Sequence, residues 1–264
     1  MLSVKNLSFS YRKQRGANDS HLLLKSINLD VTRGEFVVLI GANGAGKSTL
    51  IKMMCSVLKP DSGTIYLDGR DIQSMSRYER SRKIAYVPQA INDDQCRLSV
   101  YEVVAQGLDR ALSRTQRSRW DAVLTTLEEV GLTRYATTPL HRLSGGERQR
   151  VWIARALITH SDYLILDEPI SALDMKYQAH IMGFLRSLAH EGRAVLAIVH
   201  DINVAAGFAD RIALVHQGHI VASGSACQVM TSEVLSDIYR TPIDIVQVNS
   251  RPIALTWPED QEAR

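Results

Sequence analysis

The amino-acid sequence of 264 residues predicts an α/β fold: a core with a mixed central sheet, an antiparallel β unit at the N-terminus and an α-helical unit inserted into the core. Three short apolar runs predict the core, because strands buried on both faces of a parallel sheet read as continuous apolar stretches. These runs are Phe36–Ile40, Tyr163–Leu166 and Ala194–Val199. A charged segment with helical periodicity lies between the first two and predicts the inserted unit.

The N-terminal residues predict the antiparallel unit. Residues 2–11 and 22–31 alternate polar and apolar side chains, which is typical of half-buried strands, and the polar stretch 12–20 between them reads as a loop. Residues 64–67 form a further strand-like run, and the Asp-Gly pair after it is a common hairpin turn.

Helices are indicated where apolar residues recur every three or four positions. One helix is predicted after the first buried run and stops at Lys59–Gly63. Its apolar positions are Leu50, Ile51, Met54, Val57 and Leu58. The helical unit covers about 99–159. Beyond the later buried strands, 211–215 and 219–222 are expected to pair, and a terminal helix with a short tail follows Gly224.

We expect one domain over residues 1–264, since this length can form a single large core. The core and the β unit are expected at about 1–90 and 160–240, the helical unit at about 91–159, and a C-terminal tail at about 241–264.

Composition narrows the class of protein. A net charge of +3 gives no case for nucleic-acid binding. The three cysteines Cys55, Cys96 and Cys227 are far apart and odd in number, which favours reduced thiols in the cytoplasm. The longest apolar run is far shorter than the roughly 20 residues that cross a bilayer, and residues 1–11 lack a signal-peptide pattern. A membrane process would therefore need another polypeptide to span the bilayer.

The segment Gly41-x-x-x-x-Gly46-Lys47-Ser48 fits the pattern of a phosphate-binding loop. Lys47 is expected to reach the β- and γ-phosphates, Ser48 to ligate Mg²⁺, and Thr49 to assist at the α-phosphate. The alternative is a glycine-rich turn with an incidental lysine, but a buried strand before the segment and a helix after it argue against that. The backbone amides that would face phosphate belong to Asn43, Gly44, Ala45 and Gly46.

Two carboxylates, Asp167 and Glu168, follow the buried run Tyr163–Leu166. Ligands bind where the strands of an α/β sheet end. Asp167 is expected to hold Mg²⁺, directly or through water, and Glu168 to act as the general base toward the attacking water. Taken alone, the pair could equally be solvated charges at a strand end; the phosphate-binding loop makes the catalytic interpretation strong.

The segment Ser144-Gly145-Gly146-Glu147 opens a predicted helix, with Ser144 as a good N-cap residue. Alone, it would be an ordinary capped helix start. The functional interpretation is a second anion site, in which a hydroxyl and two glycine amides face a γ-phosphate. Because the chain already has a complete phosphate-binding loop, a second phosphate-binding helix start suggests a site shared between two subunits.

The order of these motifs resembles that of ATP-binding-cassette ATPases, which have a P-loop NTPase core, and the resemblance covers essentially the whole chain. The quoted motifs are the phosphate-binding loop Gly41–Thr49, the Leu-Ser-Gly-Gly-Glu of residues 143–147, the Leu-Ile-Leu-Asp-Glu-Pro of residues 164–169, the Ser-Ala-Leu-Asp of residues 171–174, and His200-Asp201.

The resemblance implies ATP and Mg²⁺ as cofactors and adds site residues. Gln89 matches the glutamine that contacts Mg²⁺ and the attacking water and couples to the membrane partner. His200 matches the histidine that contacts the γ-phosphate, although alone it would read as a strand-end histidine. Tyr11 matches the aromatic that stacks on adenine, with a strand-edge tyrosine as the alternative. Residues 171–174 match the loop that crosses between subunits, which brings Asp174 to the nucleotide site.

Two positions depart from the family's pattern. Ile170 stands where threonine is usual, and Glu147 stands where glutamine is commoner. Neither supplies a catalytic group in this interpretation, so activity is expected to survive both.

The resemblance further implies a head-to-tail dimer, in which each ATP lies between the phosphate-binding loop of one copy and Ser144-Gly145-Gly146 of the other. The stretches 66–72, 82–89 and 237–253 are similar to those of importers of iron chelates, haem and cobalamin. The implied partners are membrane-spanning permease subunits and, indirectly, a periplasmic or lipoprotein substrate-binding protein. The implied location is the cytoplasmic face of the inner membrane.

Other functions are weighed against this one. The chain could serve an importer of another solute or metal ion. A cassette ATPase of DNA repair or ribosomes usually has two cassettes or a long coiled-coil insertion, and neither is found here. A P-loop kinase or GTPase lacks the Leu-Ser-Gly-Gly-Glu helix, and the Asn-Lys-x-Asp string of GTPases is absent from this sequence.

Overall fold

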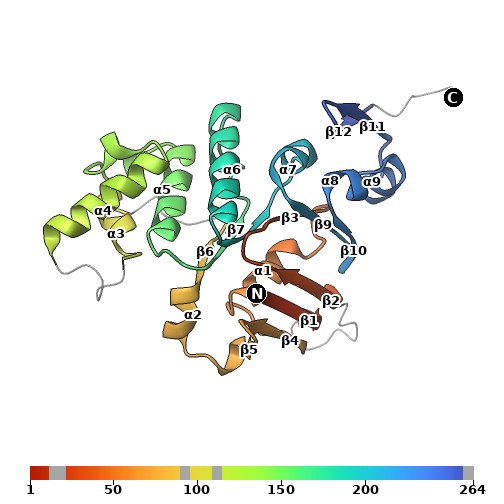
Figure 1. The fold of residues 1–264 in the computed structure, drawn as a ribbon, viewed down its shortest axis with the longest axis horizontal. Helices are drawn as coiled ribbons and strands as arrows, with labels where there is room; N and C mark the ends of the chain where they lie inside the picture. The colour runs from red at the N-terminus through yellow and green to blue at the C-terminus, as the bar shows by residue number, and fades with distance from the viewer. Residues whose placement is uncertain (12–21, 90–95, 109–114, 258–264) are drawn as a thin grey trace.

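The computed structural model describes residues 1–11, 22–89, 96–108 and 115–257. Its centre is a six-stranded sheet in the order β10-β9-β3-β8-β7-β6 (Figure 1). Neighbouring strands from β9 to β6 are parallel, and β10 is antiparallel to β9, so the predicted mixed sheet is confirmed. The strands are β3 (Phe36–Ile40), β6 (Ile84–Val87), β7 (Tyr163–Asp167), β8 (Ala194–Ile198), β9 (Arg211–His216) and β10 (His219–Gly224).

The register of the parallel strands determines where the functional segments leave the sheet. Leu39 of β3 pairs with Ile198 of β8, and Asp167 of β7 pairs with the same residue. The carboxyl ends of three buried strands therefore lie at one edge of the sheet. The phosphate-binding loop, Glu168 and His200 follow these strands and lie at this edge. Ligands of α/β proteins bind at the same kind of edge.

Strand β6 was not predicted from the sequence. It has only four residues and follows the highly charged helix α2 (Arg77–Lys83) directly. Its pairing with β7 makes it the edge strand of the central sheet. Gln89 lies two residues after the end of this strand.

A second sheet, in the order β2-β1-β4-β5, is antiparallel throughout, as predicted. Its apolar side chains, such as Leu2, Val4 and Leu7, are buried against α1 and one face of the central sheet. The loop predicted at 12–20 lies outside the described residues. The strands are β1 (Leu2–Phe9), β2 (Leu24–Val31), β4 (Ser62–Leu67) and β5 (Arg70–Asp71).

Helices cover the sheets, and the predicted helical insertion is confirmed: α3, α4 and α5 pack together on the left of Figure 1. The helices are α1 (Lys47–Met54), α2 (Arg77–Lys83), α3 (Val100–Ala105), α4 (Gln116–Glu129), α5 (Gly145–Leu157), α6 (Met175–His190), α7 (Ile202–Phe208), α8 (Ala226–Val229) and α9 (Ser232–Tyr239). Short 3₁₀ helices cover Ile72–Ser74, Thr133–Tyr135 and Leu140–Arg142.

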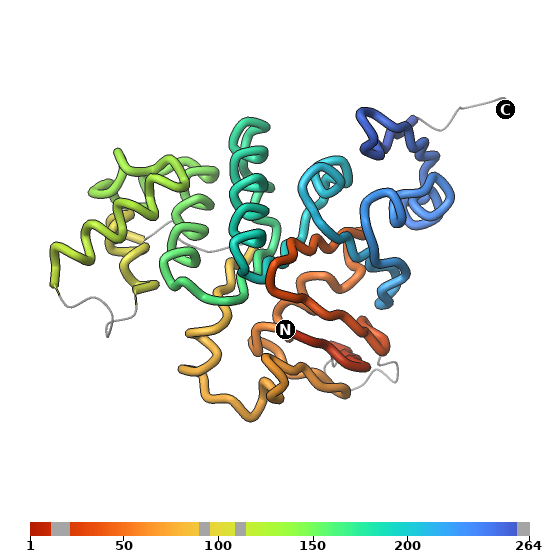
Figure 2. Tube along the Cα trace, in the orientation of Figure 1, coloured from red at the N-terminus to blue at the C-terminus, as the bar shows by residue number. Residues whose placement is uncertain are grey.

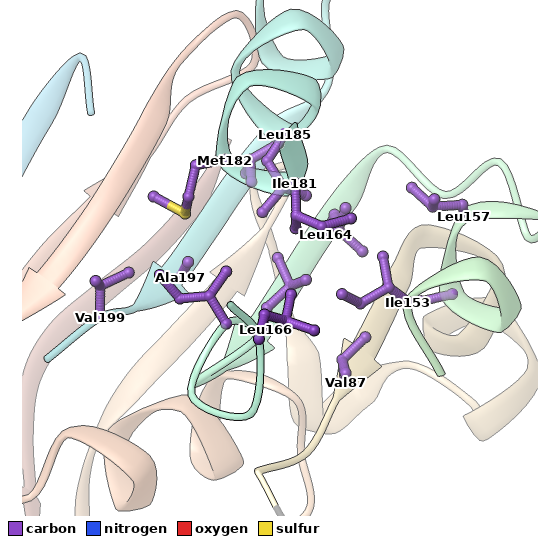
Figure 3. Close-up of a cluster of buried hydrophobic side chains, with 14 of the residues drawn as sticks. Val87, Ile153, Leu157, Leu164, Leu166, Ile181, Met182, Leu185, Ala197 and Val199 are labelled. Carbon is purple, nitrogen blue, oxygen red and sulfur yellow. The ribbon is translucent and has the colours of Figure 1, made fainter. Parts of the chain in front are cut away.

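The main core lies between the central sheet and helices α5 and α6 (Figure 3). Leu164 and Leu166 of β7 meet Ile153 of α5 and Ile181 of α6, and all four side chains are buried. Each such burial contributes about 1.5–3 kcal/mol to folding. This core holds β7 in place and therefore also the two carboxylates at its end.

The C-terminal prediction of one helix and a short tail was wrong. Two helices, α8 and α9, are followed by an antiparallel hairpin of β11 (Ile243–Val248) and β12 (Arg251–Thr256). The two turn residues, Asn249 and Ser250, both have positive φ, 50° and 61°, which is the backbone that a tight hairpin turn requires. An Asn-Ser pair is a weaker hairpin signal than Asn-Gly, so the turn was missed.

Helix α1 also ends earlier than predicted. It stops at Met54, and Ser56 has a positive φ of 55°. Val57, which was assigned to the apolar helix face, is 58% exposed, while Leu58 packs at the margin of the core.

Arg211 ties the two sheets together at the start of β9. Its Nε and Nη2 donate to the Glu35 carboxylate at 2.6 and 2.9 Å, and Nη2 also donates to the Asp30 carbonyl of β2 at 2.6 Å. The bond from Arg211 lowers the pKa of Glu35, although partial burial opposes this. The ionised form of Glu35 therefore stabilises the junction between the sheets.

We predict that Glu35→Gln lowers the free energy of unfolding by about 1–3 kcal/mol at pH 7, because Arg211 loses a charged partner. A depressed folded-state pKa stabilises the protein above the unfolded pKa, and this contribution is lost as the pH falls through the folded value. The difference in the free energy of unfolding between wild type and variant, measured by urea denaturation, should therefore become smaller at acid pH. A difference that stays constant, or one that is equally large for the exposed Glu128→Gln, would contradict this role.

Candidate functional site

The loop between β3 and α1 is shaped by its glycines. Gly41 has φ 143°, and a Cβ at this position would lie 2.0 Å from the Val215 carbonyl oxygen. Gly46, the N-cap of α1, is left-handed with φ 98° and provides no side-chain cap. The first amides of α1 are therefore left for a ligand, and the start of the helix favours an anion.

Lys47 is folded back onto this loop. Its Nζ donates to the carbonyls of Gly41 at 2.7 Å and Ala42 at 3.0 Å, and the residue is only 6% exposed. Burial lowers the pKa of Lys47, while the nearby carboxylates of Glu168 and Asp167 oppose that shift. The site thus holds a buried cation whose hydrogen bonds go to neutral carbonyls.

Ser48 and Asp167 join α1 to the end of β7. The Ser48 Oγ donates to Oδ1 of Asp167 at 2.9 Å. Asp167 is 1% exposed, and its Oδ2 is buried without a hydrogen-bond partner among the described residues. Burial raises the pKa of Asp167, although the bond from Ser48 acts in the opposite direction. A buried carboxylate oxygen of this kind fits a cation ligand.

Glu168 and His200 meet across the same edge of the sheet. His200 Nε2 lies 2.5 Å from Oε1 of Glu168, and the glutamate side chain is much less exposed than the histidine. Glu168 has a left-handed backbone with φ 53°, a conformation that is costly for a residue with a side chain and is concentrated at functional sites. From the end of β7, the Glu168 side chain reaches His200, the second residue after β8.

Tyr11 and Thr49 form the side of the site next to the N-terminal sheet. The Tyr11 hydroxyl lies 3.2 Å from Oγ1 of Thr49, and the ring makes an edge-to-face contact with Phe9 at 4.9 Å. Tyr11 is 56% exposed. A large exposed part of the aromatic side chain is therefore available beside the first turn of α1.

Ser144 opens α5 with a complete capping box. Glu147 N donates to the Ser144 Oγ at 3.3 Å, and the backbone N of Ser144 donates to Oε2 of Glu147 at 2.9 Å. The simpler expectation of a capped helix start is therefore met. Ser144 and Gly145 are exposed. A Cβ on Gly146 would lie 2.9 Å from the Ala172 carbonyl oxygen, so this helix start packs against the 171–174 loop.

The predicted site residues thus form two groups. Lys47, Ser48, Asp167, Glu168 and His200 are brought together at the edge of the sheet, with Tyr11 and Thr49 beside them. The other group, at the starts of α5 and α6, includes Ser144 and Asp174, whose Oδ1 caps α6 by accepting from Tyr177 N at 3.0 Å. Figure 1 shows α5 on the far side of α6 from α1.

One predicted residue stands apart from both groups. Gln89 is exposed two residues beyond β6, and among the described residues it makes no hydrogen bond to Ser48 or Asp167. Asn43 is exposed on the phosphate-binding loop.

Sequence reasoning missed residues that line a cavity of about 460 Å³ beside the phosphate-binding loop. His216 and Gln217 come from the end of β9, and Tyr239 and Arg240 come from the end of α9. His216 carried a weak signal, since it ends a buried strand at the same edge as His200. Tyr239 and Arg240 carried none, because only the tertiary fold brings α9 to this edge.

Comparison with known proteins identifies the family of this chain. Residues 24–171 match the family model described as ABC transporter. The chain is 33% identical over 97% of its length to an iron(3+)-hydroxamate import ATP-binding protein of Bacillus subtilis, 94% of which is covered. It is 39% identical over 88% of its length to a hemin import ATP-binding protein of Hahella chejuensis, 93% of which is covered.

Among solved structures, the bacterial ABC transporter cassette MJ0796, which was solved as a dimer, superposes with a TM-score of 0.76 at 31% identity. The match covers 86% of this chain and 99% of that one. The chain therefore belongs to the ABC transporter family, as an ATP-binding protein of that family.

Proposed function

We propose that this chain is the ATP-hydrolysing subunit of an importer and that it works as a head-to-tail dimer beneath a membrane-spanning permease. The observation that carries the proposal is the cluster at the carboxyl edge of the sheet. There a buried lysine, the Ser48–Asp167 hydrogen bond and the Glu168–His200 pair face the amides of a helix start. This arrangement has the parts that phosphoryl transfer to water requires.

The phosphate-binding loop would hold the β- and γ-phosphates of ATP. Amides from Asn43 to Gly46 line the loop, and Lys47 would exchange its bonds to two neutral carbonyls for phosphate oxygens, which are stronger partners for a buried ammonium. The exposed face of Tyr11 would stack on the adenine ring. Each of these contacts neutralises charge or fixes position.

Ser48, Asp167 and Gln89 would hold Mg²⁺, which supplies charge neutralisation at the phosphates when bound. The buried, unpartnered Oδ2 of Asp167 supports this assignment. No group of three or more His, Cys, Asp or Glu residues suited to a metal occurs within the described ranges. Mg²⁺ prefers oxygen ligands and is commonly completed by substrate phosphates and water, so a site with few protein ligands fits this ion.

Glu168 would take the proton of the attacking water, and His200 would hold the γ-phosphate. Their 2.5 Å contact places the base and the phosphate-binding side chain side by side before substrate arrives. Glu168 makes this contact from a left-handed backbone, with φ 53°, directly after β7. A base fixed in this way does not have to be reoriented during the reaction.

The second half of each site would come from another copy of the chain. The start of α5 has exposed residues Ser144 and Gly145 and lies on the far side of α6 from the phosphate-binding loop of its own chain (Figure 1). An exposed helix start with glycines favours an anion. Placed over the γ-phosphate held by a second copy, it would give both helix starts the same anion to bind. Closure of the dimer would then depend on ATP.

The permease would dock in a groove beside Gln89. A cavity of about 610 Å³ lies between the β6 side, with Tyr78 and Tyr86, and the helical insertion, with Leu108 and Trp152. Pro88, the neighbour of Gln89, also lines this cavity. A segment of the permease seated there could displace Gln89 relative to the catalytic edge. No helix of the described ranges is long and apolar enough to span a membrane.

The cargo we propose is a metal chelate of the siderophore, haem or cobalamin type. The relatives named for iron(3+)-hydroxamate and hemin import support this choice. A substrate-binding protein outside the membrane would deliver the chelate to the permease, and this chain would work on the cytoplasmic face of the inner membrane.

We predict that Glu168→Gln leaves the affinity for ATP within about threefold of wild type but lowers kcat at least ~100-fold, since a general base contributes 10²–10⁴. The amide keeps the size of the side chain but cannot accept the proton. ATP binding and phosphate release should be measured together, with exposed Glu191→Gln as the control. A variant that hydrolyses ATP at close to the wild-type rate would refute the assignment of the base.

We predict that Ser144→Arg spares ATP binding by the monomer and abolishes hydrolysis, because the bulky side chain blocks the closure of a second copy. Ser76→Arg is the matched control: Ser76 opens α2 with the same kind of capping box, so both changes remove a cap worth about 1 kcal/mol. Turnover and ATP-dependent dimer formation are the measurements. Full activity in Ser144→Arg would contradict the shared site.

A further inference from the structure

Helix α5 carries a buried arginine one turn after its exposed start. Arg150 lies four residues after Gly146, so the two residues share a face of the helix, and Arg150 is only 4% exposed. Its Nε is buried without a hydrogen-bond partner among the described residues. Burying a guanidinium is costly unless its surroundings compensate the charge. The groups around Arg150 therefore have to stabilise a cation inside the protein.

The first compensating groups are at the end of α4. Nη1 of Arg150 donates to the Val130 carbonyl at 2.8 Å and to the Gly131 carbonyl at 3.4 Å. Val130 is the C-cap of α4, and the carbonyls at the end of a helix carry partial negative charge, which favours a cation. Arg150 thus joins α5 to the end of α4.

The second compensating group is on α6. The central carbon of the Arg150 guanidinium lies 3.9 Å from the centroid of the Tyr177 ring, and a desolvated cation is attracted by the face of such a ring. Tyr177 is fixed in the first turn of α6, because its backbone N donates to Oδ1 of Asp174 at 3.0 Å. In the view of Figure 2, the trace of α5 runs between α4 and α6. One side chain of α5 therefore contacts both neighbouring helices.

Helix α6 also contacts the end of α4 directly. Nε2 of His180 lies 3.0 Å from the carbonyl oxygen of Glu129, the last residue of α4. His180 follows Tyr177 by about one helical turn. The end of α4 is thus bound by one side chain from α5 and by one from α6, which fixes how the two helices sit relative to each other.

The loop between β7 and α6 is enclosed by the same two helices. Nε2 of Gln178 on α6 donates to the carbonyls of Ile170 at 3.3 Å and Leu173 at 3.0 Å. On the other side, a Cβ on Gly146 of α5 would lie 2.9 Å from the carbonyl oxygen of Ala172. The start of α5 and this loop are therefore in direct contact.

We propose that Arg150 and Tyr177 are positioning residues that hold the start of α5 and the 171–174 loop in one fixed arrangement, which is presented to a second copy of the chain. The inference rests on the proposed function, in which the start of α5 acts on the nucleotide of the other copy. Both residues act through the elements that they hold. The phosphate-binding loop of the same copy lies on the other side of α6 (Figure 1), so loss of either residue leaves its ATP binding unchanged.

Three variants test the contact itself. Arg150→Met removes the cation and keeps an apolar side chain, and Tyr177→Leu removes the ring. Each should lower kcat on the order of tenfold, because a misplaced group in a shared site slows the reaction, while the affinity of the monomer for ATP stays within about twofold. Tyr177→Phe keeps the aromatic face and should keep kcat within about twofold of wild type.

The deciding measurement mixes two defective chains. Glu168→Gln lacks the base but has an intact α5 start, whereas Arg150→Met keeps its base. In a mixed dimer, the base of the Arg150→Met copy meets the α5 start of the Glu168→Gln copy, and one complete site results. Random pairing of equal amounts should therefore raise turnover to about a quarter of the wild-type value, above that of either protein alone.

A purely structural role for Arg150 gives a different result. Damage to the copy's own half of the site would leave the mixture at the mean of the two separate proteins, and this outcome would overturn the inference. A Tyr177→Phe variant as impaired as Tyr177→Leu would also overturn it, since the ring is retained. If Arg150→Met does not fold, the same mixture made with Tyr177→Leu decides the question.

Reference proteins separate this inference from the proposed function. Ser144→Ala changes the α5 start itself, so its turnover should also recover when it is mixed with Glu168→Gln. Absence of that recovery would count against the shared site of the proposed function. Lys47→Ala should show no recovery, because both defects then lie in the same half of the site. Arg134→Met removes an exposed arginine over the Tyr135 ring in the same insertion and should keep the wild-type kcat.

Discussion

Two opposite charges are buried at one edge of the parallel sheet, and the rest of the site depends on how they are accommodated. Lys47 and Asp167 are 6% and 1% exposed. Burying ionised groups is costly unless they are paired and hydrogen-bonded. Here the lysine has only carbonyl partners, and one oxygen of Asp167 has no partner within the described part of the chain. Phosphate oxygens and a cation would complete both groups. The fold thus holds charges that ATP and Mg²⁺ can stabilise.

The two helix starts are separated within one chain (Figure 1). A single chain has one helix start for the nucleotide at Gly46, and the other, at Ser144, is exposed and distant from it. In the proposed dimer, each ATP would be the contact that joins them, so binding and closure would be one event. Loss of the γ-phosphate would remove the shared anion and release the two copies, which converts hydrolysis into movement. The groove near Gln89 would link that movement to the permease.

Much of this could be predicted from the sequence because the relevant signals are local. Continuous apolar runs mark β3, β7 and β8, and the glycine pattern before Lys47 needs no tertiary context. The missed features depend on distant contacts or on weak turn signals. β6 is four residues long and is stabilised by pairing with β7. The final hairpin turns on Asn249-Ser250. Tyr239 and Gly41 line the same cavity only in the folded chain, where residues far apart in sequence come together.

The most direct test of the central claim asks which surfaces meet when ATP binds. In the Glu168→Gln protein with its native cysteines replaced by serine, Asn43→Cys and Ser144→Cys would be made on separate chains and oxidised alone and as a mixture. A head-to-tail dimer predicts disulfide-linked dimers only in the mixture and only with ATP, since the phosphate-binding loop of one copy faces the α5 start of the other. ATP-dependent linkage of Asn43→Cys to itself, or no linkage in the mixture, would contradict the account.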